Sequence, residues 1–222
     1  MLCVAKGMSA SMPRDYLKDP AAIYRQSFAT IEAEAGLERL PLALRAMARR
    51  MVHACGMVDI VDDLAWGGDP VSASRAALAK NAPILVDARM VAAGIIAARF
   101  PKTEIICAIA ADETADLARR LGTTRSAAAI ELWRPRLEGG IVAIGNAPTA
   151  LFHLLDLIES GGPRPAAIFG FPVGFVGAAE SKQALIDADL GIPYVTLRGR
   201  RGGSAITAAA INALLDEIGD AA

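Results

Sequence analysis

The sequence has few aromatic residues and few cysteines. Aromatic side chains make up 5% of the 222 residues, so a core must be built mainly from Ala, Val, Ile and Leu, which suits helices packed closely on a sheet. The three cysteines lie far apart and form no CxxC pair, which favours a reducing, cytoplasmic location. The sequence has no secretion signal and no apolar run of membrane-spanning length.

An excess of charge of one sign is also absent. The chain has 23 basic and 24 acidic residues, and its net charge is -1. A nucleic-acid-binding or membrane-surface protein would be expected to carry a basic excess. With 54% hydrophobic and 21% charged residues, the sequence is typical of a folded globular protein, and we predict neither nucleic acid nor membrane as a partner.

Several catalytic and nucleotide-binding motifs are missing as well. No GxxxxGK[ST] segment occurs, which excludes a P-loop, and no GxSxG segment occurs, which argues against an α/β-hydrolase. The segment GFPVGFVG spaces its glycines as GxxxGxxG rather than GxGxxG. The two histidines, His53 and His153, have no metal-ligand spacing, and we predict no metal site.

From residue 82 onward, short apolar runs alternate with helical stretches. The runs are rich in β-branched residues and apolar on both faces, which predicts a mostly parallel sheet covered on both sides, that is, a three-layer α/β/α fold. The predicted strands are 83–87, 104–109, 140–145, 166–171 and 194–198. The predicted helical stretches are 88–99, 113–133, 147–160, 178–190 and 204–218.

The residues before this alternation predict a helical N-terminal part. Asp19-Pro20 suits a helix start, and Tyr24 and Ser27 then lie one turn apart. A second helix is expected from Pro41 to the stop signal at Gly56, followed by a short helix and a turn over 57–71. We expect one domain over residues 1–222, in which residues 1–12 form a flexible extension.

Three glycine-rich loops follow predicted strands and lead directly into helices, over residues 142–152, 168–182 and 197–210. Backbone N–H groups at such helix starts bind anions well. For each loop alone, glycines that serve only a tight turn are the simpler explanation. Because the carboxyl ends of parallel strands share one sheet edge, three such loops together favour a ligand with several anionic groups.

Two further residues, Arg125 and His53, could have chemical roles. Arg125 is expected in the first turn of a helix that Thr123 or Thr124 can cap, where its positive charge opposes the helix dipole. Two roles are open for this side chain: it binds a carboxylate of a ligand, or it bonds to a neighbouring loop. In RRMVHACG, Arg49 and Arg50 lie one turn before His53 and are expected on a similar face.

The position of His53 has two explanations. The helix end favours its charged form and the arginines disfavour it, which would suit acid or base work. A histidine that merely suits a helix C-terminus is equally consistent with the sequence. His153, placed between apolar residues of another predicted helix, is interpreted as structural or half-exposed.

Long segments of the sequence resemble the precorrin-8X methylmutase family of the cobalamin pathway. They are DPAAIYRQSFATIEAEA, RMVHACG, APILVDARMV, GTTRSAAA, VAIGNAPTALF, GFPVGFVGAAESK and RGRRGGSAITAAAINAL, and they span about Tyr16 to Leu215. The resemblance implies an isomerase that moves a methyl group between neighbouring carbons of precorrin-8X to give hydrogenobyrinic acid, without a cofactor. The alternatives are the cobalt-precorrin-8 methylmutase of the anaerobic route and a non-catalytic tetrapyrrole-binding carrier.

The same resemblance implies roles for individual residues. It makes His53 the general acid that protonates the macrocycle, and it implies a homodimer whose active site draws on both subunits. Thr123 departs from the family, which often has Asn there. The residues that the resemblance places near the substrate are Tyr24, Ser27, Arg50, Arg125 and Ser126.

Overall fold

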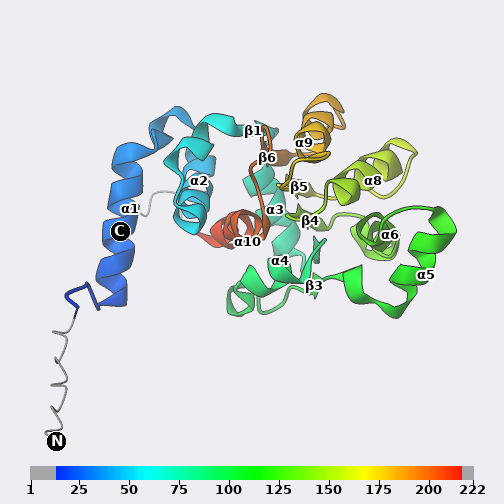
Figure 1. Ribbon diagram of the computed structural model, residues 1–222, viewed down its shortest axis with the longest axis horizontal. Helices are drawn as coiled ribbons and strands as arrows, with labels where there is room; N and C mark the ends of the chain where they lie inside the picture. Colours follow the sequence, from blue (N-terminus) through cyan, green and yellow to red (C-terminus); the bar gives the residue numbers. More distant parts are fainter. Residues whose placement is uncertain (1–13, 217–222) are drawn as a thin grey trace, which may run out of the picture.

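A six-stranded sheet forms the centre of the computed structural model, which describes residues 14–216 (Figure 1). The strand order is β1-β6-β5-β4-β2-β3; β1 is antiparallel to β6 and all other neighbours are parallel. All residues of β2, β4 and β5 are buried, as expected for strands covered on both faces. The strands are β1 (Leu64–Gly67), β2 (Ile84–Val86), β3 (Ile105–Ile106), β4 (Ile141–Ile144), β5 (Ala167–Gly170) and β6 (Tyr194–Leu197).

Helices surround this sheet. They are α1 (Pro20–Glu34), α2 (Leu42–Cys55), α3 (Pro70–Ala79), α4 (Arg89–Gly94), α5 (Asp112–Leu121), α6 (Arg125–Glu131), α7 (Arg134–Leu137), α8 (Pro148–Glu159), α9 (Ala178–Asp187) and α10 (Ser204–Asn212). The short 3₁₀ turns are η1 (Leu37–Arg39), η2 (Val58–Asp63), η3 (Ala97–Arg99), η4 (Ala108–Ala110) and η5 (Ala213–Leu215). None of the helices described between residues 14 and 216 is long and apolar enough to cross a membrane.

The two faces of the sheet bury two separate cores. Ile84 and Val86 of β2 pack into a core with α2, α3, α4 and α10, whereas Leu85 between them packs with α6, α8 and α9. This division follows from the alternation of side chains along a strand. The predicted three-layer α/β/α arrangement with a mostly parallel sheet is therefore confirmed.

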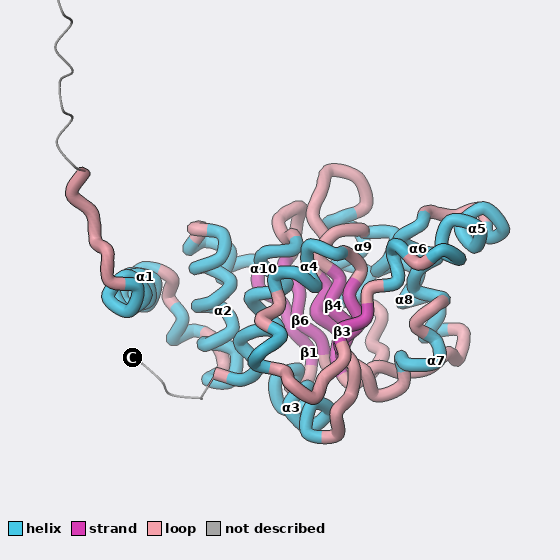
Figure 2. Tube along the Cα trace, turned by 90° about the horizontal axis from the view of Figure 1, so that it is seen from below, coloured by secondary structure: helices cyan, strands magenta, loops and turns pink. Residues whose placement is uncertain are grey.

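The helical N-terminal part is confirmed as well, and it lies at one end of the molecule. Figures 1 and 2 show α1 beyond α2, on the side away from the sheet, and α2 is its main packing partner. The Asp19 carboxylate caps α1 by accepting a hydrogen bond from the backbone N–H of Ala21 at 3.1 Å. The flexible extension predicted for residues 1–12 lies outside the described residues.

The sequence interpretation was only partly right about residues 57–71: the short helix is present as the 3₁₀ helix η2, but the strand β1 was not expected. A helix and a turn were expected there, but η2 is followed by the strand β1, which adds an antiparallel edge to the sheet by pairing with β6. The short run Leu64-Ala65-Trp66-Gly67 ends in glycine, and only its pairing with β6 defines it as a strand.

The helical stretch expected over 113–133 is interrupted. Gly122 adopts a left-handed conformation with φ of 62° and ends α5, as glycine does at many helix ends. Thr124 then caps α6, since its side chain accepts a hydrogen bond from Ala127 N–H at 3.2 Å. The last predicted helix also stops early, because α10 ends at Asn212 and passes into η5.

Candidate active site

The C-terminal end of α2 lies beside the sheet edge at which the parallel strands end. After α2, η2 leads to β1, and Leu64, the first residue of β1, is paired with Leu197, the last residue of β6. The backbone N–H of Arg198 also bonds to the carbonyl of Asp63 at 2.8 Å. In open α/β sheets ligands bind at this carboxyl edge, so the end of α2 is placed to take part in a site there.

His53 lies in the last turn of α2, and side chains of α1 surround it. Its Nδ1 is hydrogen-bonded to Ser27 Oγ at 2.8 Å. Tyr24 stacks on the imidazole with ring centroids 5.3 Å apart, and Phe28 meets it edge-on at 5.3 Å. The imidazole is therefore held in a fixed orientation while the residue stays exposed, and Nε2 is the ring nitrogen left to face a ligand.

The two arginines before His53 point to different partners. Arg49 is buried, pairs with Glu32 of α1 at 3.2 Å, and lies over the ring of Phe28 at 4.8 Å. It therefore supports the aromatic side of the His53 cluster, which we define as Tyr24, Ser27, Phe28 and His53.

Arg50 belongs to a second cluster, centred on Asp216. Its guanidinium and that of Arg99 both bond to the Asp216 carboxylate, the Arg99 contact at 2.7 Å. Burial alone would raise the pKa of Asp216, but the hydrogen bonds from the two arginines outweigh it and hold the pKa below its ordinary value. The Arg50 side chain therefore turns toward the C-terminal segment, whereas Arg49 packs on Phe28, a neighbour of His53.

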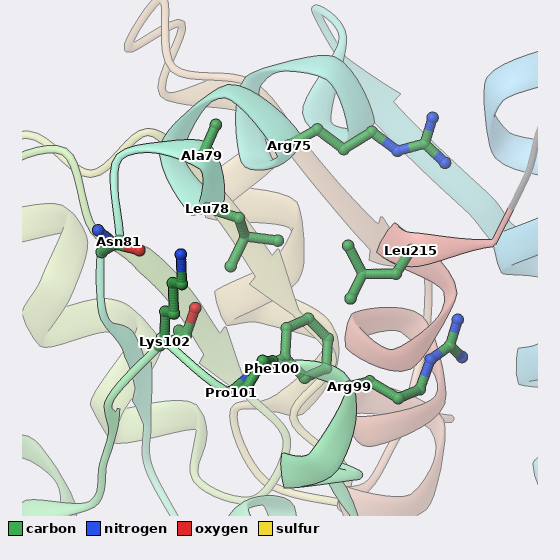
Figure 3. A pocket seen from close by; sticks show the side chains of 10 residues that line it. Arg75, Leu78, Ala79, Asn81, Arg99, Phe100, Pro101, Lys102 and Leu215 are labelled. Carbon is green, nitrogen blue, oxygen red and sulfur yellow. The ribbon is translucent and has the colours of Figure 1, made fainter.

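A pocket of about 470 Å³ lies beside the Asp216 cluster (Figure 3). It is lined by the end of α3, by residues 99–103 and by Leu215. Because α3 leads into β2 and residues 99–103 lead into β3, the pocket lies at the amino ends of these strands, opposite the edge with the loops. Its arginines already serve the C-terminal segment, since Arg75 donates to the carbonyl of Leu214 at 2.6 Å. We therefore do not assign the candidate site to this pocket.

Arg125 and Ser126 lie at the carboxyl edge but at its other end. Arg125 donates from Nη2 to the carbonyl of Ile109, in the η4 turn that follows β3, at 2.9 Å. Figure 1 shows α6 and α2 on opposite sides of the sheet centre. Of the predicted residues, the structure thus brings Tyr24, Ser27 and His53 together, and places Arg125 and Ser126 apart from them.

One of the predicted anion-binding loops already holds a carboxylate of the chain itself. Asp87, buried at the end of β2, accepts hydrogen bonds from the backbone N–H groups of Gly145, Asn146 and Ala147 at 2.8–2.9 Å. Burial raises the pKa of Asp87, and these three donors oppose that rise. The loop between β4 and α8 is therefore occupied internally. No sequence motif pointed to Asp87.

A buried lysine fixes the loop between β6 and α10. Lys182 of α9 is fully buried, and its Nζ donates to the carbonyl of Arg201 at 2.5 Å. The side chain of Arg201 in turn bonds to Asp59 at 2.6 Å and to Asp63 at 2.5 Å. Burial lowers the pKa of Lys182 to about 8, although the charge of Asp63 opposes the decrease.

We expect Lys182 to make stability depend on pH in a specific range. Between about pH 8 and the ordinary lysine pKa of 10.5, the Lys182 ammonium group has lost a proton in the folded protein but keeps it in the unfolded chain. Wild type should therefore gain up to about 3 kcal/mol of unfolding free energy relative to Lys182→Met as pH rises through this range. Urea unfolding of both proteins between pH 7 and 10.5 measures the difference, and parallel curves would contradict the assignment.

His153 has a local partner. Its Nε2 is 2.6 Å from a carboxylate oxygen of Glu131, which is also bound by Arg134. The half-buried position that the sequence predicted for His153 agrees with this pairing between α8 and α6. Within residues 14–216, no group of three or more His, Cys, Asp and Glu side chains is arranged to hold a metal ion.

The fold and the arrangement of these residues define a three-layer α/β enzyme scaffold, with a fixed, exposed histidine next to the carboxyl edge of its sheet. The family model described as CbiC, precorrin-8X methylmutase, matches residues 22–217. The chain belongs to the precorrin-8X methylmutase family, a family of isomerases in cobalamin biosynthesis.

Curated relatives and solved structures agree with this assignment. A precorrin-8X methylmutase of Pseudomonas aeruginosa is 57% identical over 91% of this chain and 98% of its own length. A cobalt-precorrin-8 methylmutase of Priestia megaterium is 36% identical over 88% of this chain and 87% of its own. The crystal structure of the precorrin-8X methylmutase of Thermus thermophilus superimposes with a TM-score of 0.79 at 37% identity, covering 87% of this chain and 94% of that one.

Proposed function

We propose that the protein converts precorrin-8X into hydrogenobyrinic acid by moving one methyl group between neighbouring carbons of the macrocycle. The observation that carries the proposal is the His53 cluster, which holds a titratable side chain in place at the carboxyl edge without burying it. The cobalt-free substrate is favoured because relatives named precorrin-8X methylmutase are 57% and 55% identical, against 36% for the cobalt-precorrin-8 enzyme of Priestia megaterium.

In this proposal His53 is the general acid. A methyl shift within a conjugated ring has no leaving group, so a nucleophile would not help it. A proton placed on the macrocycle redistributes the π-electrons and lowers the barrier, and the same proton returns to the histidine when the shift is complete. Ser27 orients the imidazole through Nδ1, and Tyr24 stacks against it, so Nε2 delivers the proton. The reaction needs no cofactor.

Arg125 and Ser126 are proposed to bind the acidic side chains of the substrate. Arginine forms strong, paired hydrogen bonds with carboxylates, and precorrin-8X bears several acetate and propionate groups. The bond from Arg125 to the carbonyl of Ile109 uses Nη2, so the rest of its guanidinium can serve a ligand. Arg50 is proposed as a further substrate contact because it lies one turn before His53 on α2, although its guanidinium is paired with Asp216 in this structure.

A homodimer with shared active sites would bring the separated residues together. Helix α2, which carries His53, and helix α6, which carries Arg125, lie on opposite sides of the sheet centre (Figure 1), so a second subunit could place its own Arg125 near this His53. The exposed apolar side chains on and before α1 support such contacts. They are Tyr16, Leu17, Ile23 and Tyr24.

We expect light scattering of the purified protein at micromolar concentration to give about twice the single-chain mass of 23.1 kDa. The exposed apolar side chains of α1 would be buried in such a dimer, which stabilises it. Replacing Ile23 by Glu should shift the mass toward one chain. A wild-type mass near 23.1 kDa would contradict a shared site.

The function is tested by incubating the protein with precorrin-8X and, in parallel, with its cobalt form, and by following the visible spectrum of the product. We expect turnover of the cobalt-free substrate. The proposed location of the enzyme is the cytoplasm. Binding without turnover would support the carrier alternative, and preference for the cobalt form would support the anaerobic route.

A further inference from the structure

The loop that follows β5 (residues 171–177) and the loop that follows β6 (residues 198–203) are hydrogen-bonded to each other and form one unit. The backbone N–H of Gly203 bonds to the carbonyl of Phe171 at 2.8 Å, and that of Gly174 bonds to the carbonyl of Arg200 at 3.2 Å. At Gly202 the loops come so close that a Cβ atom would lie 2.2 Å from the carbonyl oxygen of Phe171. Because β5 and β6 are neighbours, both loops stand side by side at the carboxyl edge (Figure 1).

This fixed unit presents apolar side chains to solvent. Phe175 is 85% exposed and Val176 is 88% exposed, the two largest exposed fractions among the large hydrophobic side chains in the described part of the chain. The guanidinium of Arg200 lies over the ring of Phe175, 5.5 Å from its centroid. Large apolar side chains that are neighbours and exposed to this degree can mark a binding site, and the hydrogen bonds behind them hold them in this position.

We infer that Phe175, Val176 and Arg200 form a further part of the substrate site, in which the two apolar side chains contact the face of the tetrapyrrole and Arg200 binds one of its carboxylates. This inference rests on the proposed function. A tetrapyrrole of that kind is a large apolar ring with acidic groups at its rim, so it matches an apolar platform with a cation at its border.

The position of this unit in the fold also supports a tetrapyrrole as its ligand. The unit is joined to the region of His53, since Arg198 at its start bonds to Asp63 of η2 and Arg201 bonds to Asp59. Its backbone is anchored from behind by the buried Lys182. The platform is thus rigid before any ligand arrives, which lowers the entropy lost on binding.

The test is a spectroscopic titration of hydrogenobyrinic acid into wild type, the double variant Phe175→Ser/Val176→Ser, and Arg200→Gln. Each variant should keep the melting temperature and mass of wild type, because the altered side chains are exposed. We expect the dissociation constant to rise at least about tenfold in the double variant and about tenfold in Arg200→Gln. Leu42→Ser, which removes an exposed apolar side chain at the far end of α2 from His53, is the matched control and should bind like wild type.

The outcomes separate the possible failures. If wild type does not bind the acid, the proposed function is wrong. If wild type binds it and the double variant binds equally well, the proposed function stands and this inference is overturned. If the double variant has half the mass of wild type, Phe175 and Val176 form a subunit interface instead, which also overturns the inference.

Discussion

Replacing His53 by Ala should reduce turnover of precorrin-8X by at least about two orders of magnitude, while the fold, the dimer and product binding persist. The variant loses the proton donor. It loses no buried contact, because His53 is exposed and its partners on α1 remain packed through Phe28 and Arg49. Steady-state rates at saturating substrate measure the effect, and a product titration checks that binding is kept.

His153→Ala is the matched control for this experiment. It removes the chain's other histidine, whose partner is Glu131 rather than any residue of the His53 cluster, so its rate should remain near wild type. The turnover of Ser27→Ala should fall between those of the two variants, because the imidazole remains but loses the hydrogen bond that orients it. If His53→Ala keeps most of its activity, His53 is only a residue suited to a helix end.

Replacing Asp87 by Ala should lower the free energy of unfolding by about 4 kcal/mol or more. Three backbone N–H groups would lose their acceptor, and each such loss in a buried turn costs about 1–3 kcal/mol. Asp87→Asn should be destabilised less, because its single oxygen still accepts from part of the turn. Urea unfolding at pH 7 gives both values.

Asp62→Asn provides the control for the loss of a carboxylate. Asp62 is exposed and pairs across the surface with Arg39 at 2.8 Å, so its replacement should change stability by about 1 kcal/mol or less. An Asp87→Ala variant as stable as Asp62→Asn would show that water or another group satisfies the turn.

The sequence predicted β2, β4 and β5 well because each is an apolar run that is buried on both faces. The strand predicted over 104–109 is shorter, because only the half-buried residues Ile105 and Ile106 pair and η4 follows. The prediction failed at β1, where four residues at the edge have no pattern of their own and become a strand only through β6. The break at Gly122 was predicted only in part, since a helix capped by Thr123 or Thr124 was expected within a helical stretch assigned over 113–133. The apolar residues on either side continue as if in one helix, and only the left-handed backbone separates α5 from α6.

The site was predictable only in part. The sequence placed Tyr24 near Ser27 and His53 near the end of α2, but the contact between the two helices is a tertiary feature. It could not tell that Arg50 turns toward Asp216, since the partner is 166 residues away. Nor could it show that the Asp87 carboxylate accepts hydrogen bonds from the turn at Gly145, because neither segment has a sequence pattern that predicts this contact.

The attachment of α1 makes the candidate active site easier to open than the rest of the fold. This helix rests mainly on α2, at the end of the molecule away from the sheet. Detaching it exposes far less apolar surface than unfolding the sheet, so it belongs to the parts of a protein that open first. Ser27, Tyr24 and Phe28 leave His53 in that event, and Ile31 leaves the core that it shares with α2, while the core on the other face of the sheet stays intact. Backbone amides of residues 20–34 should accordingly exchange with solvent well before those of β4 and β5, and a bound ligand that bridges α1 to the sheet edge would slow them selectively.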